Sequence, residues 1–163
     1  MYATSPLLLS NLGYRLTEQV EVMETGHLTN TILDSQQKNP FFRSPISEKA
    51  QNVLDVGTGQ GNWAIDVAQE FPNLIVRGVD LYPPPQTWVP PNCIFEVDNV
   101  AERWTWKERF DLIHIRQFMG ALSTAQIDEF YKQAYDNLVP GGWIEQVIPS
   151  THLSRQAPLT AVG

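Results

Sequence analysis

The residues best suited to chemistry lie between positions 53 and 61, in the sequence Val-Leu-Asp-Val-Gly-Thr-Gly-Gln-Gly. The apolar residues predict a buried parallel strand, and glycines at alternate positions permit backbone angles and a close ligand approach that side chains would obstruct. An acid inside such a strand costs several kcal/mol unless a partner compensates it. We therefore expect Asp55 to meet a cationic or donor-rich ligand.

The spacing of the glycines separates several nucleotide-binding loops. A dinucleotide loop of the form G-x-G-x-x-G requires glycine where this chain has Asn62, and a phosphate-cradling P-loop requires Gly-Lys-Ser/Thr, which is absent. The D-x-G-x-G-x-G pattern instead resembles motif I of class I S-adenosylmethionine-dependent methyltransferases. In that family the loop wraps the methionine part of the cofactor, whose ammonium and sulfonium are positive. An ordinary strand-to-helix turn is the alternative interpretation.

Two further acids stand at the predicted ends of strands. Asp80 ends a strand over 74–80, and Asp98 ends a strand over 94–98. A carboxylate at the first position can accept both hydroxyl protons of a ribose, and one at the second can accept from an adenine amino group. Either acid could instead cap a helix or form a turn, which is the commoner role of Asp after a strand.

The elements around these acids alternate between strand and helix. Beyond the two strands above, we expect helices over 17–35 and 62–70 and strands over 110–116 and 143–148. Ser123 with Gln126 predicts a capping box for one more helix, which Pro140-Gly141-Gly142 should end. Strands separated by single helices imply right-handed crossovers and a parallel sheet that binds ligands at the carboxyl ends of its strands.

Composition limits the other classes of function. The chain has 163 residues, 42% of them hydrophobic and 18% charged, so a single globular domain is expected. A net charge of -7 argues against a general nucleic-acid or anionic-membrane surface. The lone Cys93 excludes an internal disulfide, and the apolar runs are too short for a membrane span. We expect an intracellular protein, in the cytoplasm or the nucleus.

Residues 53–148 resemble the LaeA-like fungal methyltransferases, and residues 13–35 resemble that family's leading segment. The resemblance is carried by the glycine loop and by Gly-Asn-Trp-Ala-Ile-Asp, Trp-Val-Pro-Pro-Asn, Trp-Thr-Trp, Phe-Asp-Leu-Ile-His-Ile-Arg and Leu-Val-Pro-Gly-Gly-Trp-Ile-Glu-Gln. It implies an α/β, Rossmann-like class I methyltransferase sheet of five parallel strands in the order 3-2-1-4-5, with helices on both faces. The implied division is a helical lead segment at 1–50, an S-adenosylmethionine-binding core at 51–150 and a tail at 151–163.

The resemblance also assigns the cofactor-binding residues. It implies that Asp55 and the glycine loop hold the methionine end of S-adenosylmethionine, that Asp80 holds the ribose, and that Asp98 with Asn99 holds the adenine. Arg116 would border the methyl group. The complete implied set is Asp55, Gly57, Thr58, Gly59, Gly61, Asp80, Leu81, Asp98, Asn99, Arg116 and Tyr14.

The chain departs from the family after the fifth strand. A complete class I sheet adds an antiparallel strand pair there, and residues 149–163 are too short and polar to supply it. The edge of the strand over 143–148 would then be uncovered. Partial unfolding, self-association, a protein partner or a truncated gene model could each account for this edge.

The remaining candidates have simpler interpretations. His114 and His27 lie on apolar faces, so we expect hydrogen-bonded core histidines rather than catalytic bases. The histidines and Cys93 lack metal-ligand spacing, so no metal is expected. We expect the four tryptophans Trp63, Trp88, Trp104 and Trp106 to pack against the core.

The leading hypothesis is a methyltransferase that acts on an oxygen, nitrogen or carbon nucleophile of a small molecule in fungal secondary metabolism. In-line displacement at a sulfonium methyl depends mainly on positioning, so no catalytic base is required. The first alternative is a catalytically weak or inactive LaeA-like protein that regulates through a partner. The second is an NAD-dependent oxidoreductase. Such enzymes share the fold, but their loop needs a third glycine at position 62, where this chain has Asn62.

Overall fold

The computed structural model describes residues 41–116, 118 and 122–147. The expected helix over 17–35, together with Tyr14 and His27, lies outside these residues. The described elements are β1 (Asn52–Val56), α2 (Asn62–Glu70), β2 (Ile75–Asp80), β3 (Cys93–Val97), β4 (Phe110–Arg116), α3 (Thr124–Asp136) and β5 (Leu138–Val147).

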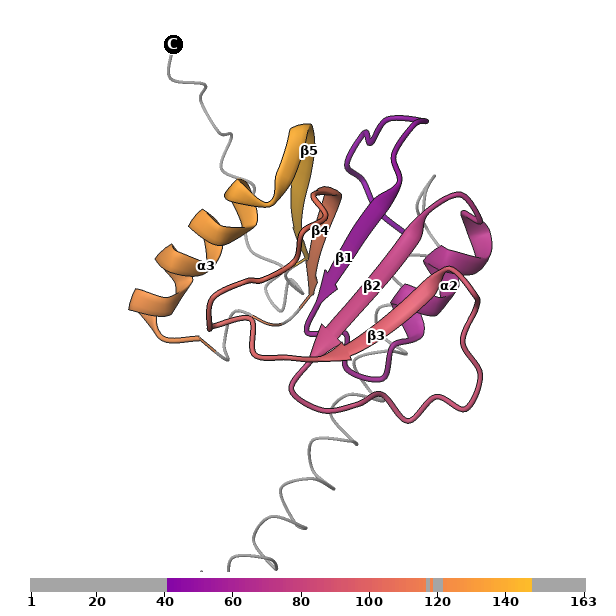
Figure 1. Ribbon diagram of the computed structural model, residues 1–163, viewed down its shortest axis with the longest axis horizontal. Helices are drawn as coiled ribbons and strands as arrows, with labels where there is room; N and C mark the ends of the chain where they lie inside the picture. Colours follow the sequence, from indigo (N-terminus) through magenta and orange to yellow (C-terminus); the bar gives the residue numbers. More distant parts are fainter. Residues whose placement is uncertain (1–40, 117, 119–121, 148–163) are drawn as a thin grey trace, which may run out of the picture.

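The strands form a single sheet in the order β3-β2-β1-β4-β5, and every pairing between neighbours is parallel. Figure 1 shows α2 beside β2 and β3, and α3 on the side of β4 and β5. The expected strand order is thereby confirmed. Because β1 lies at the centre, its carboxyl end is flanked by the ends of β2 and β4, where a doubly wound sheet binds its ligands.

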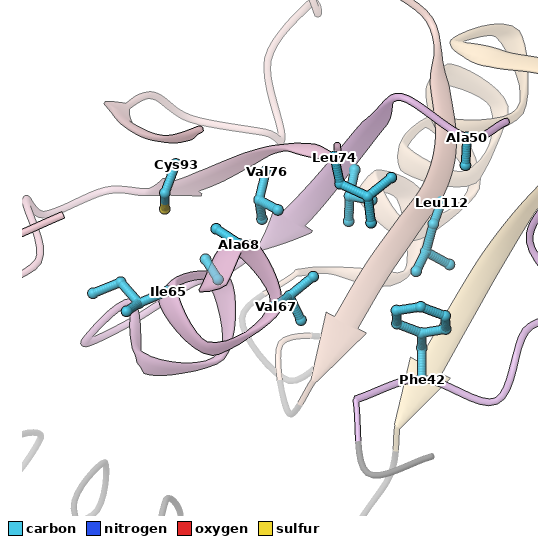
Figure 2. Packing of buried hydrophobic residues seen from close by; sticks show 11 residues of the cluster. Phe42, Ala50, Ile65, Val67, Ala68, Leu74, Val76, Cys93 and Leu112 are labelled. Atoms are coloured by element: carbon cyan, nitrogen blue, oxygen red, sulfur yellow. The ribbon is translucent and has the colours of Figure 1, made fainter. Parts of the chain in front are cut away.

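Helix α2 covers one face of the sheet. Its buried residues recur at helical spacing and meet side chains from β1, β2 and β4 (Figure 2). This cluster comprises Phe42, Ala50, Val53, Ala64, Ile65, Val67, Ala68, Leu74, Val76, Cys93 and Leu112. Phe42 belongs to the segment before β1, so that segment covers part of the same face.

Helix α3 covers the opposite face through Phe130 and Ala134. The predicted capping box is present, since the Ser123 backbone N–H donates to Gln126 Oε1 at 2.9 Å. Adjacent residues of β1 point to different faces: Val53 packs under α2 and Leu54 under α3. Both faces of the central strands are therefore buried, which requires their near-continuous apolar sequence.

The fifth strand begins earlier than the sequence predicts. Helix α3 ends at Asp136 and β5 starts at Leu138, so the Pro-Gly-Gly at 140–142 lies inside the strand. Leu138 pairs with Phe110 and Trp143 with Leu112, so the register shifts between these two pairs. Gly141 takes φ +83° in this irregularity, which a β-bulge favours. The expectation that these residues end the helix is wrong.

Three of the four tryptophans meet the expectation of packing. Trp104 is buried in the α3 cluster, where Trp106 packs against it, and Trp63 packs against the α2 cluster. Trp88 is 60% exposed, so the packing prediction fails for it. In the part of the chain that the structure describes, neither helix has the length and apolar character needed to span a bilayer.

Candidate functional site

The glycine loop joins β1 to α2 at the carboxyl edge of the sheet. Gly57, Gly59 and Gly61 have φ values of +69°, +57° and +78°. Side chains strongly disfavour this left-handed region, so the alternate spacing of the glycines is a requirement of the backbone. The sequence-based reason for the three glycines is therefore confirmed in its backbone part.

Four N–H groups of this loop donate to acceptors of the protein itself. Gly57 and Thr58 both donate to the carbonyl of Val79, at 2.9 and 3.0 Å, and Gly61 donates to the carbonyl of Thr58 at 2.9 Å. Gly59 donates to Asp80 Oδ2 at 2.9 Å. A phosphate cradle needs such N–H groups aimed at the ligand. These four N–H groups are therefore engaged by the protein and are not aimed at a phosphate.

Two of the glycines near the loop make room for an aromatic ring of the protein. A Cβ at Gly61 would lie 2.8 Å from Phe95 Cε1, and one at Gly78 would lie 2.7 Å from the same atom. A Cβ at Gly78 would also lie 2.7 Å from Thr58 Oγ1. Phe95, on β3, thus packs beneath the loop. Gly61 is needed for this contact as well as for its backbone angle.

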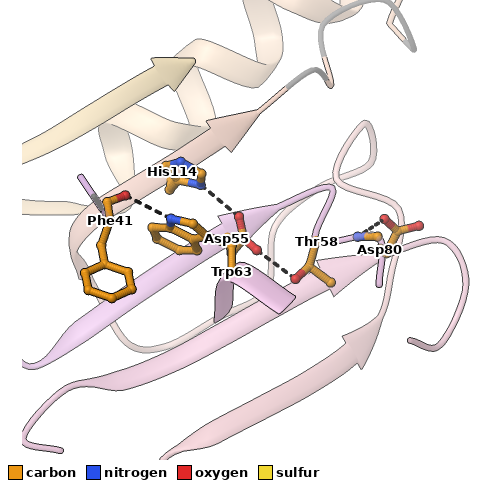
Figure 3. Close-up of polar contacts among 7 residues, drawn as sticks. Phe41, Asp55, Thr58, Trp63, Asp80 and His114 are labelled. Carbon is orange, nitrogen blue, oxygen red and sulfur yellow. Dashed lines mark hydrogen bonds and ion pairs between the residues drawn. The ribbon is translucent and has the colours of Figure 1, made fainter. Parts of the chain in front are cut away.

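Asp55 is buried in β1 with 3% of its surface exposed, and the protein itself supplies its partners. Thr58 Oγ1 donates to Asp55 Oδ2 at 2.7 Å, and His114 Nδ1 lies 2.9 Å from Asp55 Oδ1 (Figure 3). Trp63 stacks on the His114 ring with centroids 3.7 Å apart, and its Nε1–H donates to the Phe41 carbonyl. The compensation that the sequence analysis sought from a ligand is therefore provided by Thr58 and His114.

The other two acids lie together at the ends of β2 and β3. The Asp98 backbone N–H donates to the Asp80 carbonyl at 3.0 Å. Asp80 is half-buried, and its Oδ1 accepts from the N–H of Tyr82, two residues on, at 3.3 Å, which matches the turn-forming alternative for this acid. Asp98 is exposed, and its Oδ1 accepts from the Asn99 N–H at 2.7 Å. Asp98 is therefore open to solvent, and Asp80 is partly so.

The remaining candidates follow the same edge. Leu81 directly follows β2 and is 57% exposed, and Asn99 Oδ1 accepts from the Ala101 N–H at 3.1 Å. Arg116 ends β4 and is half-buried. The structure thus brings ten of the eleven sequence-predicted residues to the carboxyl ends of β1 to β4, and Tyr14 lies outside the described residues.

Sequence reasoning found His114 as a core histidine but missed that it pairs with Asp55. In the register of the sheet, His114 on β4 lies between Asp55 on β1 and Glu145 on β5. These polar residues form one row across the face that α2 covers. The available signal was a polar residue inside each of two buried strands.

The negative charge of Asp55 also affects the pKa of Cys93. Burial raises the pKa of the Cys93 thiol from 9.0 to about 11, and the negative charge of Asp55 adds to this shift. The thiol is therefore protonated at neutral pH. Within the described ranges, no group of three or more histidine, cysteine, aspartate or glutamate side chains is arranged to hold a metal ion.

The sheet order and the left-handed glycine loop define a class I methyltransferase fold. Coclaurine N-methyltransferase, bound to N-methylheliamine and SAH, aligns with 61% of this chain and 31% of its own, with TM-score 0.54 and 18% identity. A TehB-like SAM-dependent methyltransferase from Corynebacterium glutamicum aligns with 60% of this chain and 54% of its own, with TM-score 0.52 and 22% identity. At these identities the likeness establishes the fold alone.

The family model described as a methyltransferase domain matches residues 30–161, and the chain belongs to that family. Methyltransferase pytC from Aspergillus terreus is 36% identical over 129 residues, which are 78% of this chain and 38% of the relative. The secondary metabolism regulator laeA from Aspergillus niger is 45% identical over 96 residues, which are 58% of this chain and 25% of the relative. The chain thus spans less than two fifths of the length of these relatives.

Proposed function

We propose that this chain is an S-adenosylmethionine-dependent methyltransferase of fungal secondary metabolism that acts on a small-molecule acceptor. The observation that carries the proposal is the hydrogen bond from the Gly59 N–H to Asp80 Oδ2 at 2.9 Å. This bond links the end of β2 to the glycine loop. The Asp80 carboxylate and the loop therefore lie next to each other at the carboxyl edge of the sheet, where a ligand would bind. The curated relatives named as methyltransferases add support for the reaction.

The residues of the edge fit this cofactor by charge and by hydrogen bonding. Four loop N–H groups donate to the protein, Asp80 is half-buried and Asp98 is exposed to solvent. A ligand with a ribose diol and a positive sulfonium suits acceptor carboxylates, whereas an anionic phosphate would be repelled. When bound, the cofactor would supply an activated methyl group for displacement by a nucleophile.

The chain's own contribution is positioning. Asp80 would accept the ribose hydroxyls, and its bond to Gly59 would keep the carboxylate in one orientation. Arg116 at the end of β4 would border the transferred methyl. Holding the reactants in line can contribute about 7–11 kcal/mol to the lowering of the barrier, so no catalytic base is assigned.

The test compares two carboxylates that make the same kind of bond at opposite ends of the sheet. Asp80 accepts a backbone N–H at the carboxyl end, and Asp111 Oδ2 accepts the Gln51 and Asn52 N–H groups at the amino end. Calorimetry should find that Asp80→Asn weakens the binding of S-adenosylmethionine and S-adenosylhomocysteine at least about tenfold. Asp111→Asn should leave both affinities within about twofold. Folded wild-type protein that binds neither ligand would refute the proposal.

A further inference from the structure

The two nitrogens of the His114 imidazole differ in their hydrogen bonding. An ionised carboxylate only accepts hydrogen bonds, so the Nδ1 that lies 2.9 Å from Asp55 Oδ1 carries the hydrogen. His114 has no exposed surface. Its other nitrogen, Nε2, is buried and has no hydrogen-bond partner among the residues that the structure describes. The ring is therefore held from one side.

The residues around the ring explain why Nε2 is left without a partner. Trp63 covers a face of the imidazole with an interplanar angle of 6°, and a stacked ring offers no hydrogen bond in the imidazole plane. Glu145 is in register with His114, but its carboxylate accepts from the Arg43 and Ser44 N–H groups and from the Ser44 hydroxyl. The polar function of His114 in this region therefore rests on Nδ1.

The contact continues from Asp55 into the glycine loop. Asp55 Oδ2 accepts the Thr58 hydroxyl at 2.7 Å, and Thr58 lies between the first two glycines. The Thr58 N–H donates to the Val79 carbonyl, so both the backbone and the side chain of this residue are tied down. Figure 3 shows the continuous path from His114 through Asp55 to Thr58.

We propose that His114 is a positioning residue of the cofactor site, which holds Asp55 through Nδ1 and thereby fixes Thr58 and the glycine loop. This inference rests on the proposed function of the loop and adds a residue that has no exposed surface. Asp55 acts within the same path, because both of its oxygens are already engaged by protein donors. This role gives a reason for burying the ionisable pair Asp55 and His114 directly beneath the proposed cofactor site.

Replacing His114 by asparagine or by glutamine distinguishes the roles of the two ring nitrogens. In His114→Asn the amide nitrogen lies near the former Nδ1 and can still donate to Asp55. In His114→Gln it lies near the former Nε2 and cannot reach Asp55 without rearrangement. Both variants lose the stack on Trp63 and carry the same chemical group, so each is the other's control.

Calorimetry on the full chain should give a dissociation constant for S-adenosylhomocysteine within about threefold of wild type for His114→Asn and about tenfold weaker for His114→Gln. Thr58→Val, which keeps the shape but removes the hydroxyl, should weaken binding by a similar factor. Ile113→Val, adjacent in β4 and buried on the other face, is the matched control that should lower the melting temperature and leave affinity unchanged.

Hydrogen exchange of the loop peptide without ligand gives a second readout. Exchange should accelerate in His114→Gln and Thr58→Val but not in His114→Asn. The role of Nδ1 would be overturned if His114→Asn and His114→Gln had equal effects on affinity and exchange. It would also be overturned if both variants lowered the melting temperature but changed neither affinity nor exchange. If wild type binds no cofactor while exchange still follows the Asn and Gln pattern, the proposed function fails and the positioning role stands.

Discussion

The substitution Gly78→Ala tests whether the glycine loop is supported from below by Phe95. Gly78 is buried in β2, beside Asp55 in the register. An added Cβ would lie 2.7 Å from Phe95 Cε1 and 2.7 Å from Thr58 Oγ1, both closer than ordinary contact. The ring can rotate or shift, but the hydroxyl is held by its 2.7 Å bond to Asp55.

The expected magnitude follows from two opposing effects. Alanine in place of a strand glycine gains roughly 0.5–1 kcal/mol of conformational entropy. Overpacking a filled site costs about 1–3 kcal/mol, and here two neighbours must move. We therefore expect Gly78→Ala to lower the free energy of unfolding by about 1–2 kcal/mol and to weaken cofactor binding, since Thr58 is displaced.

The assay is a double-mutant cycle with Phe95→Leu in urea denaturation, followed by calorimetry with S-adenosylhomocysteine. Leucine removes the ring atoms near Gly78, so the double variant should be about 1 kcal/mol more stable than the sum of the single losses predicts. Binding should stay weakened, because the contact with Thr58 remains. A neutral or stabilising Gly78→Ala, or strictly additive losses, would refute the packing argument.

Three further predictions concern the core and the segment before β1. The Cys93 thiol should react slowly with a disulfide reagent at pH 8 in the native state and fully after denaturation, because burial raises its pKa to about 11. Since native Cys93 keeps a proton that the unfolded chain loses above pH 9.0, the free energy of unfolding should fall between pH 9 and 11, by up to about 3 kcal/mol, and Cys93→Ala should remove this slope. Glu145→Gln should lower stability by about 1–3 kcal/mol through its weaker bonds to Ser44, measured in urea; a loss no larger than that of exposed Glu129→Gln would contradict this.

Much of the fold follows from local signals in the sequence. The limits of α2 and β4 agree with the predicted 62–70 and 110–116, because an apolar period and a buried apolar run mark them clearly. The start of β5 was not predictable from Pro-Gly-Gly alone. Its irregularity lies between the pairs Phe110–Leu138 and Leu112–Trp143, where a Cβ at Gly142 would lie 2.9 Å from the Phe110 carbonyl oxygen.

For the site, the amino-acid sequence by itself determined the glycine loop and the acids at the ends of β2 and β3, since residue type and spacing dictate backbone angles and strand ends. The tertiary structure alone decided which partner each acid has. Asp55 and His114 are 59 positions apart, and only the parallel register of β1 and β4 places them side by side. A long-range hydrogen bond depends on register and on burial from both faces, and neither is encoded within a single segment of the chain.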